Sequence, residues 1–126
     1  MPLVLACRRA VPALLLAGTV VVGAAAEPAD DGWLLVGHQG LIAQVLVPLP
    51  QARDRAAYAR QIERLCAERE TCFVNFYTNT TGAAVTLPLP DAIAREATAT
   101  LRRSAKQGVE AFRWSCRLAM PEPDCF

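Results

Sequence analysis

The sequence has very little histidine and lysine. Of its 126 residues only His38 is a histidine and only Lys106 is a lysine, so arginine supplies almost all of the basic charge. A zinc site needs several clustered cysteine and histidine ligands, which one histidine and widely spaced cysteines do not provide. We therefore expect no metal and no cofactor. His38 lies in a glycine-flanked turn without a carboxylate neighbour in sequence, which favours a solvated residue over a catalytic one.

A surplus of positive charge is also missing. Removal of residues 1–26 takes away two of the thirteen basic residues and none of the twelve acidic ones, which leaves a net charge of −1. Binding to phosphate backbones requires a concentrated basic surface. The charge balance therefore argues against nucleic acid as a partner, and it gives no attraction to membrane surfaces.

The cysteine spacing lacks the pattern of a thiol–disulfide enzyme. Such enzymes place C-x-x-C at the N-terminus of a helix, where the dipole lowers a thiol pKa. Here five residues separate Cys66 from Cys72, and Cys66 falls at the C-terminal end of a predicted helix. No grouping of nucleophile, base and orienting acid can be read from the sequence either, which favours a non-catalytic protein.

The N-terminal segment has the pattern of a cleavable secretory signal. Two arginines, Arg8 and Arg9, precede an apolar run over residues 10–23, and three alanines separate this run from polar residues. We predict cleavage between Ala26 and Glu27. The alternative is an uncleaved anchor, but the apolar run is short for a span of about 20 residues. The prediction is a signal peptide over 1–26 and a single domain over 27–126, periplasmic or extracellular and without stable membrane insertion.

Four cysteines remain after cleavage, an even number in an exported chain. Exported domains of this size commonly use disulfides to supplement a small core. We therefore expect two disulfides among Cys66, Cys72, Cys116 and Cys125.

Hydrophobic periodicity predicts the element order β-β-α-β-(β)-α-β. A hairpin is followed by an amphipathic helix, a central strand, a short strand or extended loop, a second helix and a last strand. The second helix begins at Pro90 and is capped by Gly108, with Ile93, Ala97, Leu101 and Ala105 on its buried side. In chain order, the hairpin covers 33–47, the first helix 51–67 and the central strand 72–77. The short strand or loop covers 83–87, the second helix 90–108 and the last strand 109–116.

This order predicts a small two-layer α/β sandwich, with α+β as the alternative class. It contains a mixed sheet of four or five strands, and both helices lie on one face. Right-handed crossovers would make the last three strands parallel. Cys66 and Cys72 would then lie at one rim of the sheet and Cys116 at the other, about 20 Å away, too far for a disulfide. Pairing of Cys66 with Cys72 and of Cys116 with Cys125 is therefore favoured.

The strand over 72–77 indicates a candidate binding face. Cys72, Val74 and Phe76 form its more apolar side and should face the helices, whereas Phe73, Asn75 and Tyr77 should lie on the open side of the sheet. Aromatic side chains around an amide with arginine nearby are typical of a binding surface. Two alternatives are that the C-terminal tail covers this face or that Asn75 only satisfies a backbone group. The full set of candidates on this face is Phe73, Asn75, Tyr77, Asn79 and Arg113.

These features predict a small exported, non-catalytic binding or accessory protein. Its partner would be a protein or a small ligand, and self-association through the open face is an alternative. The second functional hypothesis is a small hydrolase-like enzyme with its site near Asn79, at the carboxyl end of the 72–78 strand.

Overall fold

The computed structural model describes residue 18 and residues 31–126. The predicted signal peptide and its cleavage site therefore lie outside the described residues, apart from Gly18. In the described part of the chain, no helix has the length and apolar character that a membrane span requires.

Five strands form one mixed sheet whose spatial order is the order of the chain. Strands β2 and β3 are parallel, and the other neighbouring pairs are antiparallel. Consequently β2, β3 and β5 run in one direction and β1 and β4 in the other. The elements are β1 (Leu34–Gln39), β2 (Ile42–Leu46), α1 (Arg55–Cys66), β3 (Thr71–Tyr77), α2 (Asp91–Ala94), β4 (Ala97–Ser104) and β5 (Val109–Trp114).

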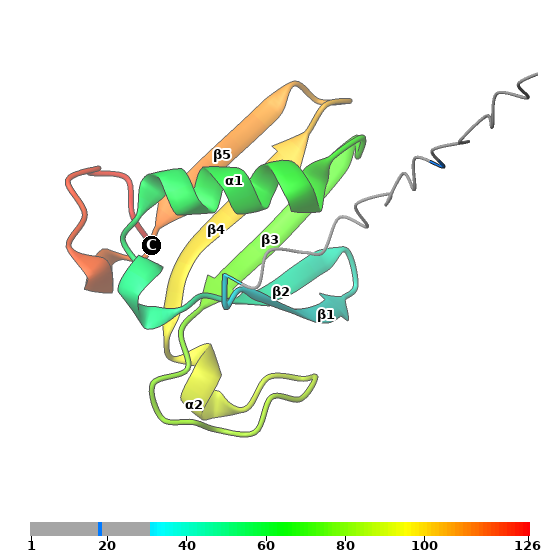
Figure 1. Cartoon of the computed structure of the whole chain (residues 1–126). Coiled ribbons are helices and arrows are strands. Elements are labelled where there is room, and N and C mark those ends of the chain that lie inside the picture. Colours follow the sequence, from blue (N-terminus) through cyan, green and yellow to red (C-terminus); the bar gives the residue numbers. More distant parts are fainter. Residues whose placement is uncertain (1–17, 19–30) are drawn as a thin grey trace, which may run out of the picture.

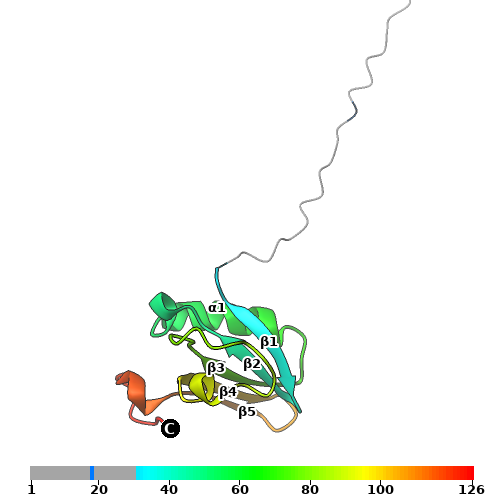
Figure 2. The same cartoon turned by 90° about the horizontal axis from the view of Figure 1, so that it is seen from below.

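Helix α1 packs on one face of this sheet, which gives the two-layer sandwich predicted from the sequence (Figures 1 and 2). Asp54 caps the helix, because its side chain accepts a hydrogen bond from the Ala57 N–H. The helix turns Tyr58, Ile62 and Cys66 toward the sheet and leaves its charged residues in solvent.

The prediction of a second long helix is wrong. Only Asp91–Ala94 is helical, and the chain continues as strand β4, antiparallel to both β3 and β5. Buried Ala99 and Leu101 face α1 together, while Thr100 and Arg102 occupy the other side of the strand. The predicted pair of crossovers is therefore replaced by one crossover, β2–α1–β3, followed by antiparallel neighbours.

The connection between β3 and β4, residues 78–96, contains no strand, so residues 83–87 form an extended loop. It contains α2 and lies beyond the carboxyl end of β3 (Figure 1). We call this segment the β3–β4 connection.

Tyr58 lies at the centre of the core between α1 and the sheet. Its ring makes edge-to-face contacts with Trp33, Phe76, Phe112 and Trp114, with centroid separations of 4.9–5.7 Å. Edge-to-face pairs of this kind stabilise a core beyond the burial of their area. Aromatic residues from three separate segments, the residue before β1, β3 and β5, are thus held around one helical side chain.

Two disulfides close the ends of the domain. Cys66 pairs with Cys72, and Cys116 pairs with Cys125. This is the pairing favoured from the sequence, because β5 runs in the same direction as β3 and carries Cys116 to the opposite rim. The second disulfide holds the tail beside β5, where the Phe126 N–H donates a backbone hydrogen bond of 3.1 Å to the Trp114 carbonyl.

Candidate functional site

The structure brings Phe73, Asn75 and Tyr77 together on the sheet face opposite α1. All three are half-buried, whereas the alternating residues of β3 are fully buried beneath α1. The Asn75 side chain donates a hydrogen bond of 3.3 Å to the Tyr77 hydroxyl. These residues therefore form the connected polar and aromatic row that the alternation of β3 predicts.

Arg102 of β4 completes this row, because β-sheet register places it directly opposite Phe73. Its guanidinium carbon lies 5.8 Å from the centre of the Phe73 ring, within the range of a cation–π contact. One Nη2–H donates to Asn75 Oδ1 at 2.8 Å. We call Phe73, Asn75, Tyr77 and Arg102 the Arg102 cluster.

The guanidinium of Arg102 is also tied to the backbone. Its Nη1 donates to the Val74 carbonyl at 3.2 Å and to the Leu101 carbonyl at 2.8 Å. Arginine has five N–H donors, so these three hydrogen bonds leave Nε–H and one Nη2–H for another acceptor. These two donors belong to neighbouring nitrogens of the planar guanidinium.

Arg102 carries its charge without a carboxylate partner. Burial lowers the pKa of Arg102 and the nearby Tyr77 opposes that shift, but an arginine remains protonated in neutral solution. Within residues 31–126, four other arginines form ion pairs and Arg102 forms none. In the described residues this half-buried positive charge is thus balanced by carbonyl and amide dipoles and by the Phe73 ring, without a carboxylate.

Arg113 lies on the same face but holds the C-terminal tail. It donates to the Cys125 carbonyl at 2.8 Å, pairs with Asp124 at 3.2 Å and stacks 5.9 Å from the centre of the Phe126 ring. The tail therefore covers the β5 margin of the face, which was one alternative considered from the sequence. The charge of Arg113 is already neutralised there.

The β3–β4 connection covers part of the opposite margin. Leu87 approaches Gly37 of β1 so closely that a β-carbon on the glycine would lie 2.6 Å from Leu87 Cδ1. Gly37 pairs with Gln44, and Gln44 pairs with Asn75, so Leu87 lies on the Arg102 side of the sheet. The β3–β4 connection therefore accounts for the burial of Gln44 on this side of the sheet. The open surface is limited to the middle of the Arg102 side.

Asn79 lies apart from the cluster and stabilises the β3–β4 connection. Its side-chain amide donates to the Ala83 carbonyl at 2.9 Å, and its Oδ1 accepts from the Ala83 N–H at 3.1 Å. Both polar atoms of the side chain are thus engaged within the loop.

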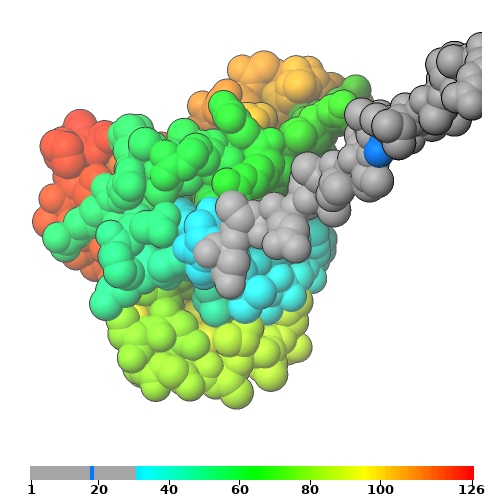
Figure 3. Space-filling view, viewed as in Figure 1, coloured from blue at the N-terminus to red at the C-terminus, as the bar shows by residue number. Residues whose placement is uncertain are grey.

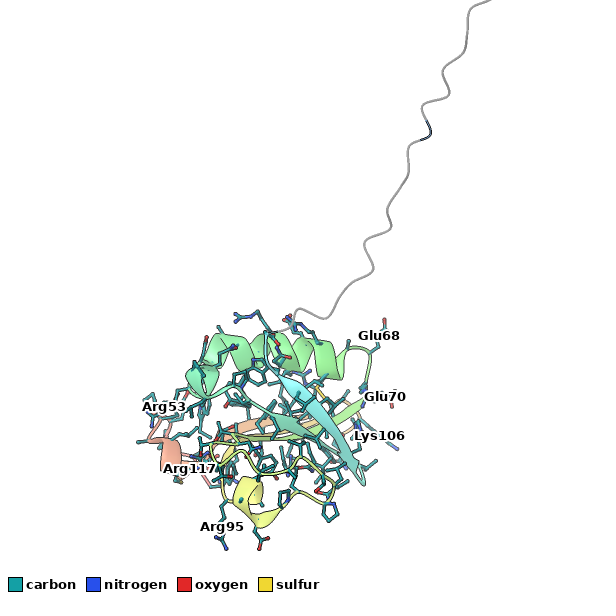
Figure 4. The ribbon with its side chains drawn as sticks, turned by 60° about the horizontal axis from the view of Figure 1, so that its bottom comes forward. Arg53, Glu68, Glu70, Arg95, Lys106 and Arg117 are labelled. Carbon is teal, nitrogen blue, oxygen red and sulfur yellow. A yellow bond between two sulfur atoms is a disulfide. The ribbon has the colours of Figure 1, made fainter. Side chains whose placement is uncertain are left out.

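Glu96 and Arg117 anchor the same connection to the rest of the domain. The Glu96 carboxylate accepts from Thr78 and from both the N–H and the hydroxyl of Thr80. Arg117 donates to the Glu96 carbonyl at 2.6 Å and to the Ala97 carbonyl at 2.7 Å. Figure 4 shows Arg117 where the C-terminal segment meets the connection, and Arg95 pointing away from the domain.

A groove of about 320 Å³ lies on the other face, between α1 and strands β4 and β5. Five strands spaced about 4.8 Å apart are wider than one helix about 10 Å across, so a single helix leaves part of the sheet uncovered. The apolar part of the lining includes Tyr58, Ile62, Leu101 and Phe112, and the charged part comprises Arg55, Glu63, Arg103 and Glu110. The absence of the second predicted helix from this face opens the groove.

Sequence reasoning missed Arg102 because residues 97–104 were assigned to a helix. In that assignment Arg102 belongs to a group of cations that favour a helix C-terminus. Strand periodicity was the available signal, since Thr98 and Thr100 are β-branched and Ala99 and Leu101 alternate with polar residues. A strand over 97–104 places Arg102 on the same face as Thr100.

In residues 31–126, no group of three or more histidine, cysteine, aspartate or glutamate side chains is arranged to hold a metal ion. Comparison of the chain with protein-family models, curated proteins and solved structures finds no match.

Proposed function

We propose that this chain is a small exported, non-catalytic binding protein whose contact surface is the sheet face around the Arg102 cluster. The observation that carries the proposal is the half-buried guanidinium of Arg102, which has no carboxylate partner in residues 31–126. The ligand or partner protein contributes a carboxylate to this position.

Export to the periplasm or the cell exterior is part of the proposal. The two disulfides fit a chain that folds in an oxidising compartment. The predicted signal peptide over 1–26 supplies the route.

A carboxylate fits the chemistry of the cluster. Arginine binds carboxylates through parallel N–H donors, and charge-assisted bonds of this type are about twice as strong as neutral ones. The Asn75 and backbone contacts hold the guanidinium in place before the ligand arrives, which reduces the entropy lost on binding. The rings of Phe73 and Tyr77 provide apolar contact for a group beside the carboxylate.

An NMR titration tests this function with two probes that differ only in charge, N-acetylphenylalanine and its amide. The acid should bind weakly, with a Kd of about 1 mM, and shift the side-chain amide signals of Asn75, whereas the neutral amide should bind at least about tenfold more weakly. Arg102→Gln should reduce binding of the acid by about tenfold.

The matched control is Arg60→Gln, which removes one positive charge from the exposed side of α1. This variant should bind the acid as the parent protein does. Equal binding of acid and amide, or normal binding of the acid by Arg102→Gln, would contradict the proposed site.

The hydrolase-like alternative near Asn79 has less support. The amide of Asn79 and the carboxylate of Glu96 are already bonded to groups of the β3–β4 connection. A substrate at this position would have to replace those bonds.

A further inference from the structure

The two edges of the sheet differ in how they are protected. Strand β5 carries Glu110 and Arg113, and the tail bonds to its carboxyl end through Trp114 and Phe126. Charged residues and covering segments are the usual means by which proteins block an edge strand. Edge β5 is therefore protected.

Strand β1 carries no charged residue, and in the described part of the chain no other segment pairs with its outer edge, although the β3–β4 connection covers one face of the strand at Gly37. Its sequence, LLVGHQ, contains no acidic residue, lysine or arginine. Within residues 31–126 its backbone groups bond only to β2, so the outer edge has free donors and acceptors. Figure 3 shows β1 in cyan at the surface, above the yellow-green β3–β4 connection.

Exposed leucines surround this edge. Leu34 and Leu35 are 47% and 45% exposed, and Leu41 in the turn after β1 is 72% exposed. Register places Leu34 on the Arg102 side of the sheet and Leu35 on the α1 side. Leu87, also exposed, contacts the strand at Gly37. Apolar side chains thus lie along both faces of an edge strand whose outer side is unpaired in the described residues, a pattern typical of interaction surfaces.

We infer that two copies of this chain associate through their β1 edges. A two-fold axis brings the same uncharged strand of each copy together, so that β1 contributes no charge to the contact and the leucines of one copy meet those of the other. A charged partner would instead place its charges against leucine side chains, which makes a second copy the better match.

The β-bulge at Val36 shapes this contact. The register of β1 with β2 shifts between Leu35 and Gly37, and bulges of this kind interrupt strand pairing. A backbone ladder between copies is therefore short, and packing of leucines supplies most of the affinity. The dimer should be weak and depend on concentration.

Sedimentation equilibrium over a concentration series tests this inference, using purified protein whose N-terminus has been determined by mass spectrometry. The parent protein should show a monomer–dimer equilibrium. Leu35→Glu places like charges across the two-fold axis and should raise the dimer dissociation constant at least tenfold. Leu41→Glu, in an exposed turn where packing within the domain is minimal, should also raise the dimer dissociation constant.

Val109→Glu is the matched control, because Val109 is 48% exposed and lies on the other edge strand. It should leave the dissociation constant within twofold of the parent value, and circular dichroism should show the same fold in all three variants. A protein that is monomeric at every concentration up to about 1 mM would overturn the inference. An equal loss of dimer in Val109→Glu would overturn it as well.

Discussion

At the scale of single residues, Tyr58 contributes to the core through both its ring and its hydroxyl. Its ring contacts four aromatic side chains, and its hydroxyl donates to the Ala52 carbonyl at 2.8 Å. The Thr98 hydroxyl lies 2.8 Å away and completes the pair by donating to Tyr58, since a carbonyl can only accept. Burial raises the pKa of Tyr58 to about 12, with opposing contributions from Thr98 and Arg117.

Tyr58→Phe should lower the free energy of unfolding by about 1–3 kcal/mol. The variant keeps the ring but leaves the buried Ala52 carbonyl and the Thr98 hydroxyl without this partner. Urea unfolding measures the change.

Tyr77→Phe is the matched control, because its hydroxyl is half-buried and accepts only the 3.3 Å bond from Asn75. Tyr77→Phe should lower the free energy of unfolding by less than about 1 kcal/mol. A Tyr58→Phe variant as stable as Tyr77→Phe would show that the buried hydroxyl contributes nothing.

Among the structural elements, the C-terminal tail depends on few contacts. Cys125 is nine positions from Cys116, and the segment between them contains one short 3-10 helix, Cys116–Leu118. Beyond the disulfide, the tail is held by backbone bonds to β5, by Arg113 and by an ion pair between Glu122 and Arg55.

Replacement of both Cys116 and Cys125 by serine should lower the free energy of unfolding by about 3 kcal/mol, the chain-entropy value for a loop of about ten residues. Urea unfolding measures this loss. Hydrogen exchange should also show faster exchange at the Phe126 amide, which bonds to the Trp114 carbonyl. Unchanged stability would mean that the noncovalent contacts hold the tail by themselves.

The element that was predicted wrongly from the sequence is β4, because its pattern fits both a helix and a strand. Leu101 is buried in both interpretations, because a helix and a strand can each place it toward a core. The cations before Gly108 fit a helix end, yet Gly108 has a φ of +64° in the turn between β4 and β5. The pairing of β4 with β3 selects the strand, and a partner separated by residues 78–96 leaves little trace in the local sequence.

The hairpin, α1, β3 and β5 could be predicted, since each has a strong local period or turn signal. The disulfide pairing followed from the direction of β5, which remains parallel to β3 although the connection between them differs from the expected one. For the Arg102 cluster, the sequence predicted the sheet face of the three β3 residues, Phe73, Asn75 and Tyr77. It did not predict that Arg102 joins them, because the position of Arg102 depends on β4 being a strand.

At the scale of the whole molecule, acid stability depends on carboxylates that hold separate segments together. Burial by itself raises the pKa of Glu96, but the bonds from Thr80 and Thr78 and the charge of Arg117 outweigh burial and lower the pKa below its ordinary value. Because the pKa is lower in the folded than in the unfolded state, ionised Glu96 stabilises the fold above its ordinary pKa of about 4.3. This contribution is lost as pH falls through the folded-state pKa.

Glu96→Gln should therefore flatten the dependence of unfolding free energy on pH below about pH 5. Urea unfolding at a series of pH values measures how the free energy of unfolding changes with pH.

Asp31→Asn should remove a separate part of this pH dependence. Burial by itself raises the pKa of Asp31, but its hydrogen bonds and the charge of Arg64 outweigh burial and lower it. A Glu96→Gln slope equal to that of the parent protein would contradict this account.

The order of strands in the sheet equals their order along the chain, and this has a kinetic consequence. Every strand pairs with a strand adjacent in sequence, but two of these pairs, β2–β3 and β3–β4, are joined by long connections over residues 47–70 and 78–96. Pairing within the hairpins β1–β2 and β4–β5 therefore loses little loop-closure entropy, whereas the pairs with β3 require longer loops to close. The two hairpins can therefore pair first, and the thiols are then brought together by the folded structure instead of by random encounter.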